Sequence, residues 1–301
     1  MSFSADVKNE ICKLSLMRPC CVLSEAYGLM LYATTFSCRE IRITTANAAL
    51  KKRIPALFKK AFGLSIPSFG DYAMTTFHLS DKSDLKTVFT AFGYEFLDTA
   101  LHLNRGIIDN ECCMGSFLRG VFLSGGSLMN PEKKYHLEFS SNHLTLNREM
   151  IALLLDLELS PKTLKRKNDY VIYLKDSGRI EDFLTLIGAP ISAMRLMQTK
   201  VEKDLRNTVN RQVNCETANL SKTVEASIRQ VNAIRVIDRA LGIASLEKPL
   251  YETALLRLEH PDATLGELAL LSKTPVSKPG LGHRLKKLID LSEKITENDN
   301  A

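Results

Sequence analysis

Basic side chains are concentrated near the C-terminal end of the 301-residue chain, in a segment suited to binding phosphate. Residues 272–287 include five Lys or Arg and one His but no acidic residue. Lys and Arg neutralise phosphates, and side chains at the start of an exposed helix reach base edges in the major groove. We predict that the DNA-contacting residues are Ser277, Lys278, Gly280, His283, Arg284, Lys286 and Lys287.

A second basic run lies in a strand-like segment near the middle of the chain. We predict a secondary DNA-binding set there, made of Lys162, Lys165, Arg166 and Lys167. The formal net charge of +6, from 40 Lys and Arg against 34 Asp and Glu, is too small by itself to identify a nucleic-acid partner. The alternative interpretation of each basic run is therefore a solvated protein surface.

The seven cysteines include two adjacent pairs, Cys20–Cys21 and Cys112–Cys113, and no C-x-x-C motif. Adjacent cysteines are poorly spaced for a disulfide or a tetrahedral zinc site. We therefore predict reduced, mostly buried thiols, with no metal site, no cofactor and no catalytic residue. The sequence shows no signal-peptide pattern at its start and no apolar run of membrane-spanning length, which predicts a cytoplasmic location.

An internal repeat organises the first two thirds of the chain. Gly28 and Gly120 each lie eight residues after the first cysteine of their pair, so the copies are offset by 120 − 28 = 92 residues. The first copy is expected to contain a helix over 24–36, a strand over 40–45, a helix over 50–62, strands near 64–67 and 74–79, and a helix over 83–92. The second is expected to contain a helix over 115–127, a strand over 135–140, a helix over 147–157, strands over 163–165 and 170–174, and a helix over 180–187.

Each copy reads α-β-β-α-β-β-α, which predicts an α+β body with a pseudo-two-fold axis. We place this body at 1–195, with repeats at about 1–104 and 105–195. The polar segment 196–221 is predicted to be an ordered joint between domains.

The remaining segment, 222–295, is predicted to be an all-α domain. Apolar residues recur at intervals of three and four from Val224 to Leu241, and Gly242 offers a stop. A capping box from Thr264 to Glu267 opens a short helix, and Ser277 is a second N-cap. A short helix, a turn and a longer basic helix over about 264–290 predict a helix-turn-helix, the alternative being a helical interaction bundle.

The segment 118–126 resembles the LAGLIDADG motif of homing endonucleases, and 26–34 is a weaker match. In that family two such helices pack side by side, which requires small residues between them. The candidates in this chain are Gly28, Ala33, Gly120, Ser124 and Gly125. The nucleases of the family carry a metal-binding acid just before the last motif position, where this sequence has Ala33 and Gly125. Neither residue can bind a metal ion, so the resemblance implies a body without nuclease activity.

Over nearly its whole length the chain resembles the WhiA family of bacterial regulators. The matching segments are 1–4, 117–127, 135–138, 213–220 and 277–287. The resemblance implies a LAGLIDADG-like domain joined to a helix-turn-helix, with a role in transcriptional control of sporulation, cell division or chromosome segregation. Pro279 and Gly282 depart from the family's usual recognition helix, which puts the base preference of that helix in doubt.

Together these observations predict a DNA-binding transcription regulator that associates with the nucleoid. Its expected partners are double-stranded DNA and, beyond it, a second transcription factor or RNA polymerase. Two alternatives remain from the sequence: a residual metal-dependent endonuclease, and a body that binds a protein or ligand and carries an accessory DNA-binding tail.

Overall fold

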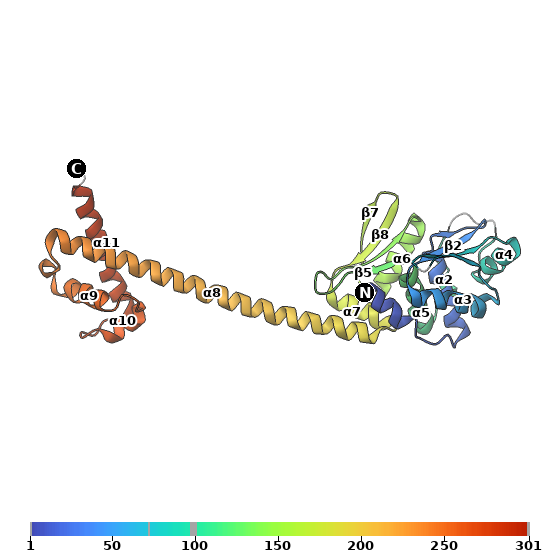
Figure 1. The fold of residues 1–301 in the computed structure, drawn as a ribbon, viewed down its shortest axis with the longest axis horizontal. Helices are drawn as coiled ribbons and strands as arrows, with labels where there is room; N and C mark the ends of the chain where they lie inside the picture. Colours follow the sequence, from blue (N-terminus) through green and yellow to red (C-terminus); the bar gives the residue numbers. More distant parts are fainter. Residues whose placement is uncertain (1, 72, 97–100, 300–301) are drawn as a thin grey trace. The chain divides into compact units, whose positions relative to one another are not determined.

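Figure 1 shows the computed structural model of the chain, which describes residues 2–71, 73–96 and 101–299. Contacts divide the chain into two compact units, Met1–Asp204 and Leu205–Ala301. The division falls within the segment 196–221, where we expected a joint. Over the described residues, no helix combines the length and the apolar character needed to cross a bilayer.

Unit 1 contains the two predicted repeats, preceded by a short helix α1 (Phe3–Ile11). The first repeat consists of α2 (Pro19–Leu31), β1 (Thr35–Phe36), β2 (Ile41–Thr45), α3 (Ala48–Phe62), β3 (Ser68–Gly70), β4 (Thr75–Leu79) and α4 (Lys82–Ala91). A 3-10 turn, η1 (Arg105–Ile107), lies between the repeats. The second repeat consists of α5 (Glu111–Gly125), β5 (Gly126–Leu128), β6 (Leu137–Ser141), α6 (Leu144–Asp156), β7 (Lys162–Arg166), β8 (Asp169–Leu174) and α7 (Ser177–Leu186).

The two repeats have the same order of elements and the same sheet topology. The strands are ordered β1-β2-β4-β3 in one sheet and β5-β6-β8-β7 in the other, and all neighbours are antiparallel. Buried residues alternate with exposed or half-buried ones along β2 and β6, so each sheet has one face on the core. The predicted α+β class and the doubled α-β-β-α-β-β-α pattern are therefore confirmed.

Several details of the repeats differ from expectation. The helices expected over 24–36 and 115–127 end at Leu31 and Gly125, and the strands β1 and β5 lie where the ends of those helices were expected. The helix α1 was not predicted, although it buries Phe3, Val7 and Ile11. The strand expected near 64–67 lies at Ser68–Gly70 instead. Pro67 has no amide hydrogen, so it contributes only its carbonyl, which accepts from the His78 amide at 2.9 Å. Residues of this segment can therefore both donate and accept hydrogen bonds with β4 only after Pro67, and β3 begins at Ser68.

Helices α2 and α5 pack against each other at the centre of unit 1, and two glycines set their separation. A Cβ added to Gly28 would lie 2.1 Å from the carbonyl oxygen of Phe117, and one added to Gly120 would lie 2.1 Å from that of Glu25. Both values are far below any real contact distance, so only glycine fits. The contacts are reciprocal, as expected for two equivalent helices that cross at one point.

The other predicted small residues lie near the C-terminal ends of these helices. Ser124 Oγ donates to the carbonyl of Tyr32 at 2.8 Å, and a Cβ on Gly125 would lie 2.7 Å from the Tyr32 ring. Ala33 is half-buried against the same core. Because the two N-terminal cysteine pairs also meet, as described below, α2 and α5 run parallel.

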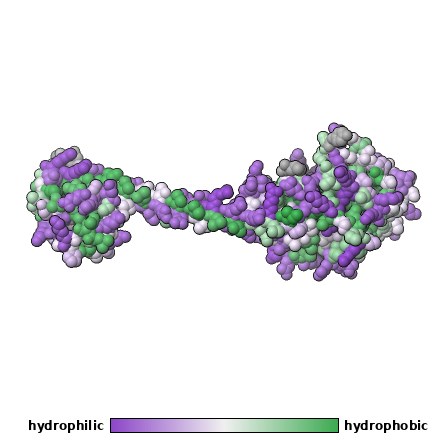
Figure 2. Space-filling model, turned by 60° about the horizontal axis from the view of Figure 1, so that its bottom comes forward, coloured by the Kyte–Doolittle hydropathy of each residue, from purple (hydrophilic) through white to green (hydrophobic). Residues whose placement is uncertain are grey.

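The expected joint is helical throughout. Helix α8 spans Pro190–Leu241, and no Gly or Pro lies between its first residue and Gly242, which ends it with φ 74°. Without such a residue nothing interrupts the backbone ladder, and polar side chains bond within the helix, as in Thr223 Oγ1 to the Asn219 carbonyl at 2.9 Å. Figure 2 shows hydrophobic surface along the long helix α8. Val209 and Val213 of this helix are more than half exposed. Local hydrogen bonds, rather than packing, maintain this part of the helix.

Unit 2 is all-α, as predicted. After α8 it contains η2 (Ile243–Ser245), α9 (Lys248–Glu259), α10 (Leu265–Leu271) and α11 (Lys278–Asp299). Pro249 lies at the start of α9, where a missing amide hydrogen costs nothing. The core of the unit consists of Ile234, Ile237, Ala254, Leu268, Leu281, Leu285 and Leu288. This second core is separate from that of unit 1.

Candidate nucleic-acid interface

Helices α10 and α11 and the turn between them form the predicted helix-turn-helix. Thr264 accepts from the Glu267 amide at 3.3 Å, and the Glu267 carboxylate accepts from the Thr264 amide at 2.7 Å, which completes the capping box. Ser277 caps α11 through its Oγ, 3.3 Å from the Gly280 amide. Both predicted caps are confirmed, and they fix where each helix begins.

Helix α11 presents one apolar and one basic side. Leu281, Leu285 and Leu288 are each about 1% exposed in the core of unit 2. Within the predicted contact set, Ser277, Lys278, His283, Lys286 and Lys287 are exposed, and Gly280 and Arg284 are half-buried. At 100° per residue, His283, Lys286 and Lys287 lie opposite the leucines, together with the exposed Asp290, whereas Ser277 and Lys278 lie at the start of the helix and nearer the apolar side. DNA contact by this set stays a prediction.

A buried arginine, which the sequence analysis did not predict to be important, stabilises the helix-turn-helix. Arg257 of α9 is 2% exposed, and its Nη1 lies 2.7 Å from the carbonyl oxygen of Ala263 and within 3.4 Å of those of His260 and Pro261. The Ser227 hydroxyl of α8 donates to the same Pro261 carbonyl. These bonds satisfy carbonyls in the turn that leads into α10, so Arg257 fixes the entry of the helix-turn-helix.

Replacing Arg257 with methionine is expected to destabilise unit 2 by about 2 kcal/mol, because the loop carbonyls lose a charged donor while the apolar stem is kept. Calorimetry of the full chain should show a lower melting temperature for the transition of unit 2. The matched control is Arg235→Met, an exposed arginine on α8. Equal stability of the two variants would contradict a supporting role for Arg257.

The second basic set does not form one surface. Along β7, Lys162 and Arg166 pair with Tyr173 and Asp169 of β8, whereas Lys165 lies on the other face with its ammonium 5.5 Å from the Tyr170 ring centre. Arg166 also lies 3.6 Å from the Glu138 carboxylate. Lys167 occupies the following turn with φ 56°. Strand alternation separates these charges, so DNA binding by this set stays a prediction.

The acid positions of the nuclease motif lie at the C-terminal ends of α2 and α5 and carry no carboxylate. A pocket of about 170 Å³ at Ala33 has one acidic residue, Asp169, among its described lining. Near Gly125, the Lys8 ammonium donates to the Leu123 carbonyl at 3.1 Å, and burial lowers the pKa of Lys8 to about 8. A cation therefore lies at the end of α5, close to the position of the missing acid.

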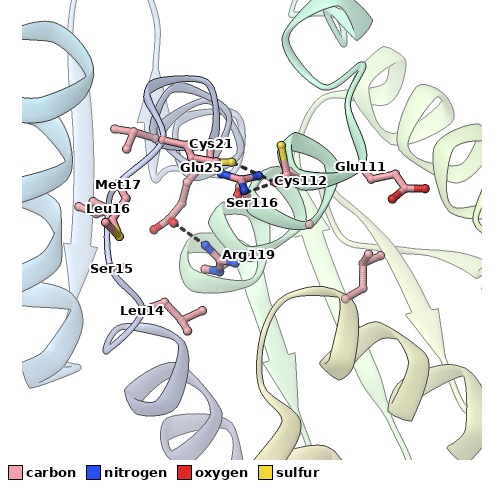
Figure 3. A pocket seen from close by; sticks show the side chains of 14 residues that line it. Leu14, Ser15, Leu16, Met17, Cys21, Glu25, Glu111, Cys112, Ser116 and Arg119 are labelled. Atoms are coloured by element: carbon pink, nitrogen blue, oxygen red, sulfur yellow. Dashed lines mark hydrogen bonds and ion pairs between the residues drawn. The ribbon is translucent and has the colours of Figure 1, made fainter.

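A buried carboxylate lies further up the same helix pair, in a pocket of about 410 Å³ (Figure 3). Glu25 of α2 is 1% exposed and pairs with Arg53 of α3, whose Nη2 is 2.8 Å from Oε2, and with Arg119 of α5 at 3.1 Å. Arg53 also donates to the Leu14 carbonyl at 2.7 Å, and Arg119 to that of Ile187 at 2.8 Å. Glu25 thus pairs with two cations inside the protein. Because Arg53 belongs to the first repeat and Arg119 to the second, these ion pairs join the two repeats.

The cysteine pairs require a correction. We expected no tetrahedral site because two adjacent cysteines cannot form one by themselves. The structure brings both pairs together, so four thiols lie at one place. The Sγ atoms of Cys20, Cys21, Cys112 and Cys113 all lie within 4.8 Å of one another, and within the described ranges they are the one group of three or more potential metal ligands. Nor are the thiols mostly buried: Cys113 alone is buried, and Cys20 and Cys215 are exposed.

Comparison with known proteins identifies both units. The family model of the WhiA LAGLIDADG-like domain matches residues 114–206, and that of the WhiA C-terminal HTH domain matches residues 209–292. The probable cell division protein WhiA of Ruminiclostridium cellulolyticum is 39% identical over 315 residues, with 99% of each chain covered. The chain belongs to the WhiA family.

Other relatives agree with this assignment. The probable cell division protein WhiA of Alkaliphilus metalliredigens is 36% identical, with 98% of each chain covered. The crystal structure of full-length WhiA from Thermatoga maritima matches with a TM-score of 0.59 and 24% identity, covering 98% of this chain and 99% of that one. The family resemblance predicted from the sequence is thus confirmed, and the shared fold extends over both units.

Proposed function

We propose that this member of the WhiA family is a DNA-binding transcription regulator of cell division, chromosome segregation or sporulation, active at the nucleoid. The observation that carries the proposal is the basic outer surface of α11. None of the ion pairs between described residues involves its exposed cations, Lys278, Lys286 and Lys287. Such cations remain available to phosphates, while residues at the start of the helix meet base edges.

The body is proposed to lack nuclease activity. In the nucleases that the repeats resemble, two acids bind the divalent metal, and this chain has Ala33 and Gly125 at those positions, with Lys8 close by. A neighbouring ammonium disfavours a bound cation. Incubating pure protein with supercoiled plasmid and Mg²⁺ or Mn²⁺ should leave the plasmid intact; cleavage that follows the protein through purification would refute this part of the proposal.

Several charges on the sheets of the body are paired within the body. Glu40 contacts Arg42 at 2.8 Å and His78 at 3.0 Å, and Glu138 contacts His136 at 3.1 Å. Lys162, Lys165 and Lys167 form no ion pair with a described residue, but they are divided between the two faces of β7 and the turn that follows. Because these cations share no single face, the body is assigned to partner recognition rather than to primary DNA binding. In this arrangement it recruits RNA polymerase or a second transcription factor to the DNA that α11 selects.

Replacing both Arg284 and Lys287 with alanine tests the proposal. We expect DNA affinity to fall roughly 10- to 100-fold and the slope of log K against log salt concentration to decrease by about 1.8, since each phosphate contact contributes about 0.9. The measurement is fluorescence anisotropy at several salt concentrations, with duplexes enriched by repeated selection against the full chain.

The matched control is the double variant Lys222→Ala and Arg239→Ala, which removes the same charge from exposed positions outside the helix-turn-helix. This variant should keep most of the affinity and the full salt slope. If instead both double variants behave like the parent chain, α11 is not the DNA-binding surface.

A further inference from the structure

The N-terminal ends of α2 and α5 bring four thiols together. Cys20 and Cys21 are the second and third residues of α2, and Cys112 and Cys113 are the second and third residues of α5. Their four sulfur atoms lie within 4.8 Å of one another. We propose that these cysteines bind one Zn²⁺ ion as a tetrahedral tetrathiolate site that joins the two repeats.

The distances between the sulfurs fit a single ion. Zinc–sulfur bonds of about 2.3 Å place the corners of a tetrahedron about 3.8 Å apart. The Sγ atoms of Cys112 and Cys113 are 3.9 Å apart, and the remaining separations, all up to 4.8 Å, need only small rotations of side chains to reach this value. A disulfide requires about 2.05 Å between sulfurs and uses two of the four thiols, whereas one central ion uses all of them.

The surroundings favour negative charge at this place. Both helices point their N-terminal ends, which carry partial positive charge, at the four sulfurs. The equivalent serines Ser24 and Ser116 donate to the carbonyls of Cys20 and Cys112, at 2.9 and 2.8 Å. The same serine-to-cysteine hydrogen bond therefore stabilises the first turn of both α2 and α5, which matches the symmetry of the proposed site.

The chemistry of the ligands selects the metal. Four thiols and Zn²⁺ give a complex of net charge 2−, with four protons released to solvent and no change in oxidation state. Thiolates favour zinc over Mg²⁺ and Ca²⁺, which require oxygen ligands. Because four protein ligands fill the coordination sphere, the site has a structural rather than a catalytic role.

The position of the site explains what the ion does. Gly28 and Gly120 each lie eight residues beyond the first cysteine of their helix, so the metal ties together two helices that already meet at these glycines. Figure 3 shows Cys21 and Cys112 from the two helices at the wall of the 410 Å³ pocket, which provides a path for the ion to enter. Cys20, which does not line this pocket, is exposed.

Metal analysis of the full chain tests the proposal. The protein is stripped with a chelator under reducing conditions, incubated with Zn²⁺ and desalted, and elemental analysis should find one zinc per chain. Co²⁺ in its place should produce the visible absorption of tetrahedral cobalt thiolate. The variant Cys20→Ser, at an exposed position that the fold tolerates, should bind zinc at least about 100-fold more weakly. Cys215→Ser, which removes an exposed thiol from α8, should bind zinc as the parent does.

Circular dichroism of each variant establishes that the body is folded, so that a loss of zinc reports on the ligand itself. Substoichiometric zinc in the folded parent, or equal affinity of the parent and Cys20→Ser, would overturn the proposal. So would disulfides between the two cysteine pairs in protein isolated under reducing conditions, because oxidised sulfurs cannot bind the ion.

Discussion

Gly120→Ala is expected to destabilise unit 1 by about 3 kcal/mol. The added Cβ would lie 2.1 Å from the Glu25 carbonyl oxygen and 2.7 Å from the Leu29 amide nitrogen. Both neighbours are backbone atoms of a central helix, so relief requires α2 and α5 to move apart. That movement opens the core that both repeats share.

Calorimetry of the full chain measures this effect as a fall of roughly 10 °C in the melting temperature of unit 1. The control is Gly266→Ala in α10, where an added Cβ has one neighbour, the Thr264 hydroxyl at 3.8 Å. An ordinary contact of this kind leaves the transition of unit 1 unchanged. If Gly120→Ala also leaves it unchanged, the two helices do not approach as closely as described.

Glu25→Leu is expected to cost unit 1 about 3 to 5 kcal/mol, because two arginines lose their common counter-charge away from solvent. The Arg53 side chain is 4% exposed and that of Arg119 15% exposed, so both cations lie largely away from solvent when the carboxylate is removed. Urea unfolding, followed by circular dichroism, measures the free energy of unfolding. The matched control is Asp156→Leu, which removes the carboxylate of an ion pair in which both side chains are 58% exposed; its stability should change little.

A double variant separates charge from packing. Glu25→Leu combined with Arg53→Met removes the main unpaired cation, and it should recover part of the stability that Glu25→Leu loses. The loss of stability in the double variant is expected to be smaller than the sum of the losses in Glu25→Leu and Arg53→Met. If the two changes are additive, Glu25 acts through shape alone, and the account of this ion pair is wrong.

The parts of the fold that follow from local patterns could be predicted from the sequence. The 92-residue repeat, the capping box at Thr264 and the apolar side of α11 depend on residues near one another along the chain. The helical joint could not be predicted in this way, because Asn and Thr favour turns in isolation and yet bond within a helix that no Gly or Pro interrupts.

The parts that depend on contacts between distant segments were missed. Arg257 becomes important only because the loop after α9 folds back over its side chain. The four-thiol cluster requires α2 and α5 to lie parallel and in register, which no spacing within one cysteine pair reveals. The signal available was the equal distance from each pair to its glycine, Gly28 or Gly120, since helices that meet at equivalent glycines also bring equivalent cysteines together.

The reciprocal glycine contact also has a consequence for synthesis on the ribosome. Gly28 meets Phe117, so the face of α2 that packs on α5 has no partner until a further 117 − 28 = 89 residues have been added. At about 5 to 20 residues per second, this interval lasts roughly 5 to 20 seconds. During that time the face of α2 that carries Gly28 lacks the helix against which it packs in the finished protein. The core that both repeats share is therefore completed only after the second repeat emerges.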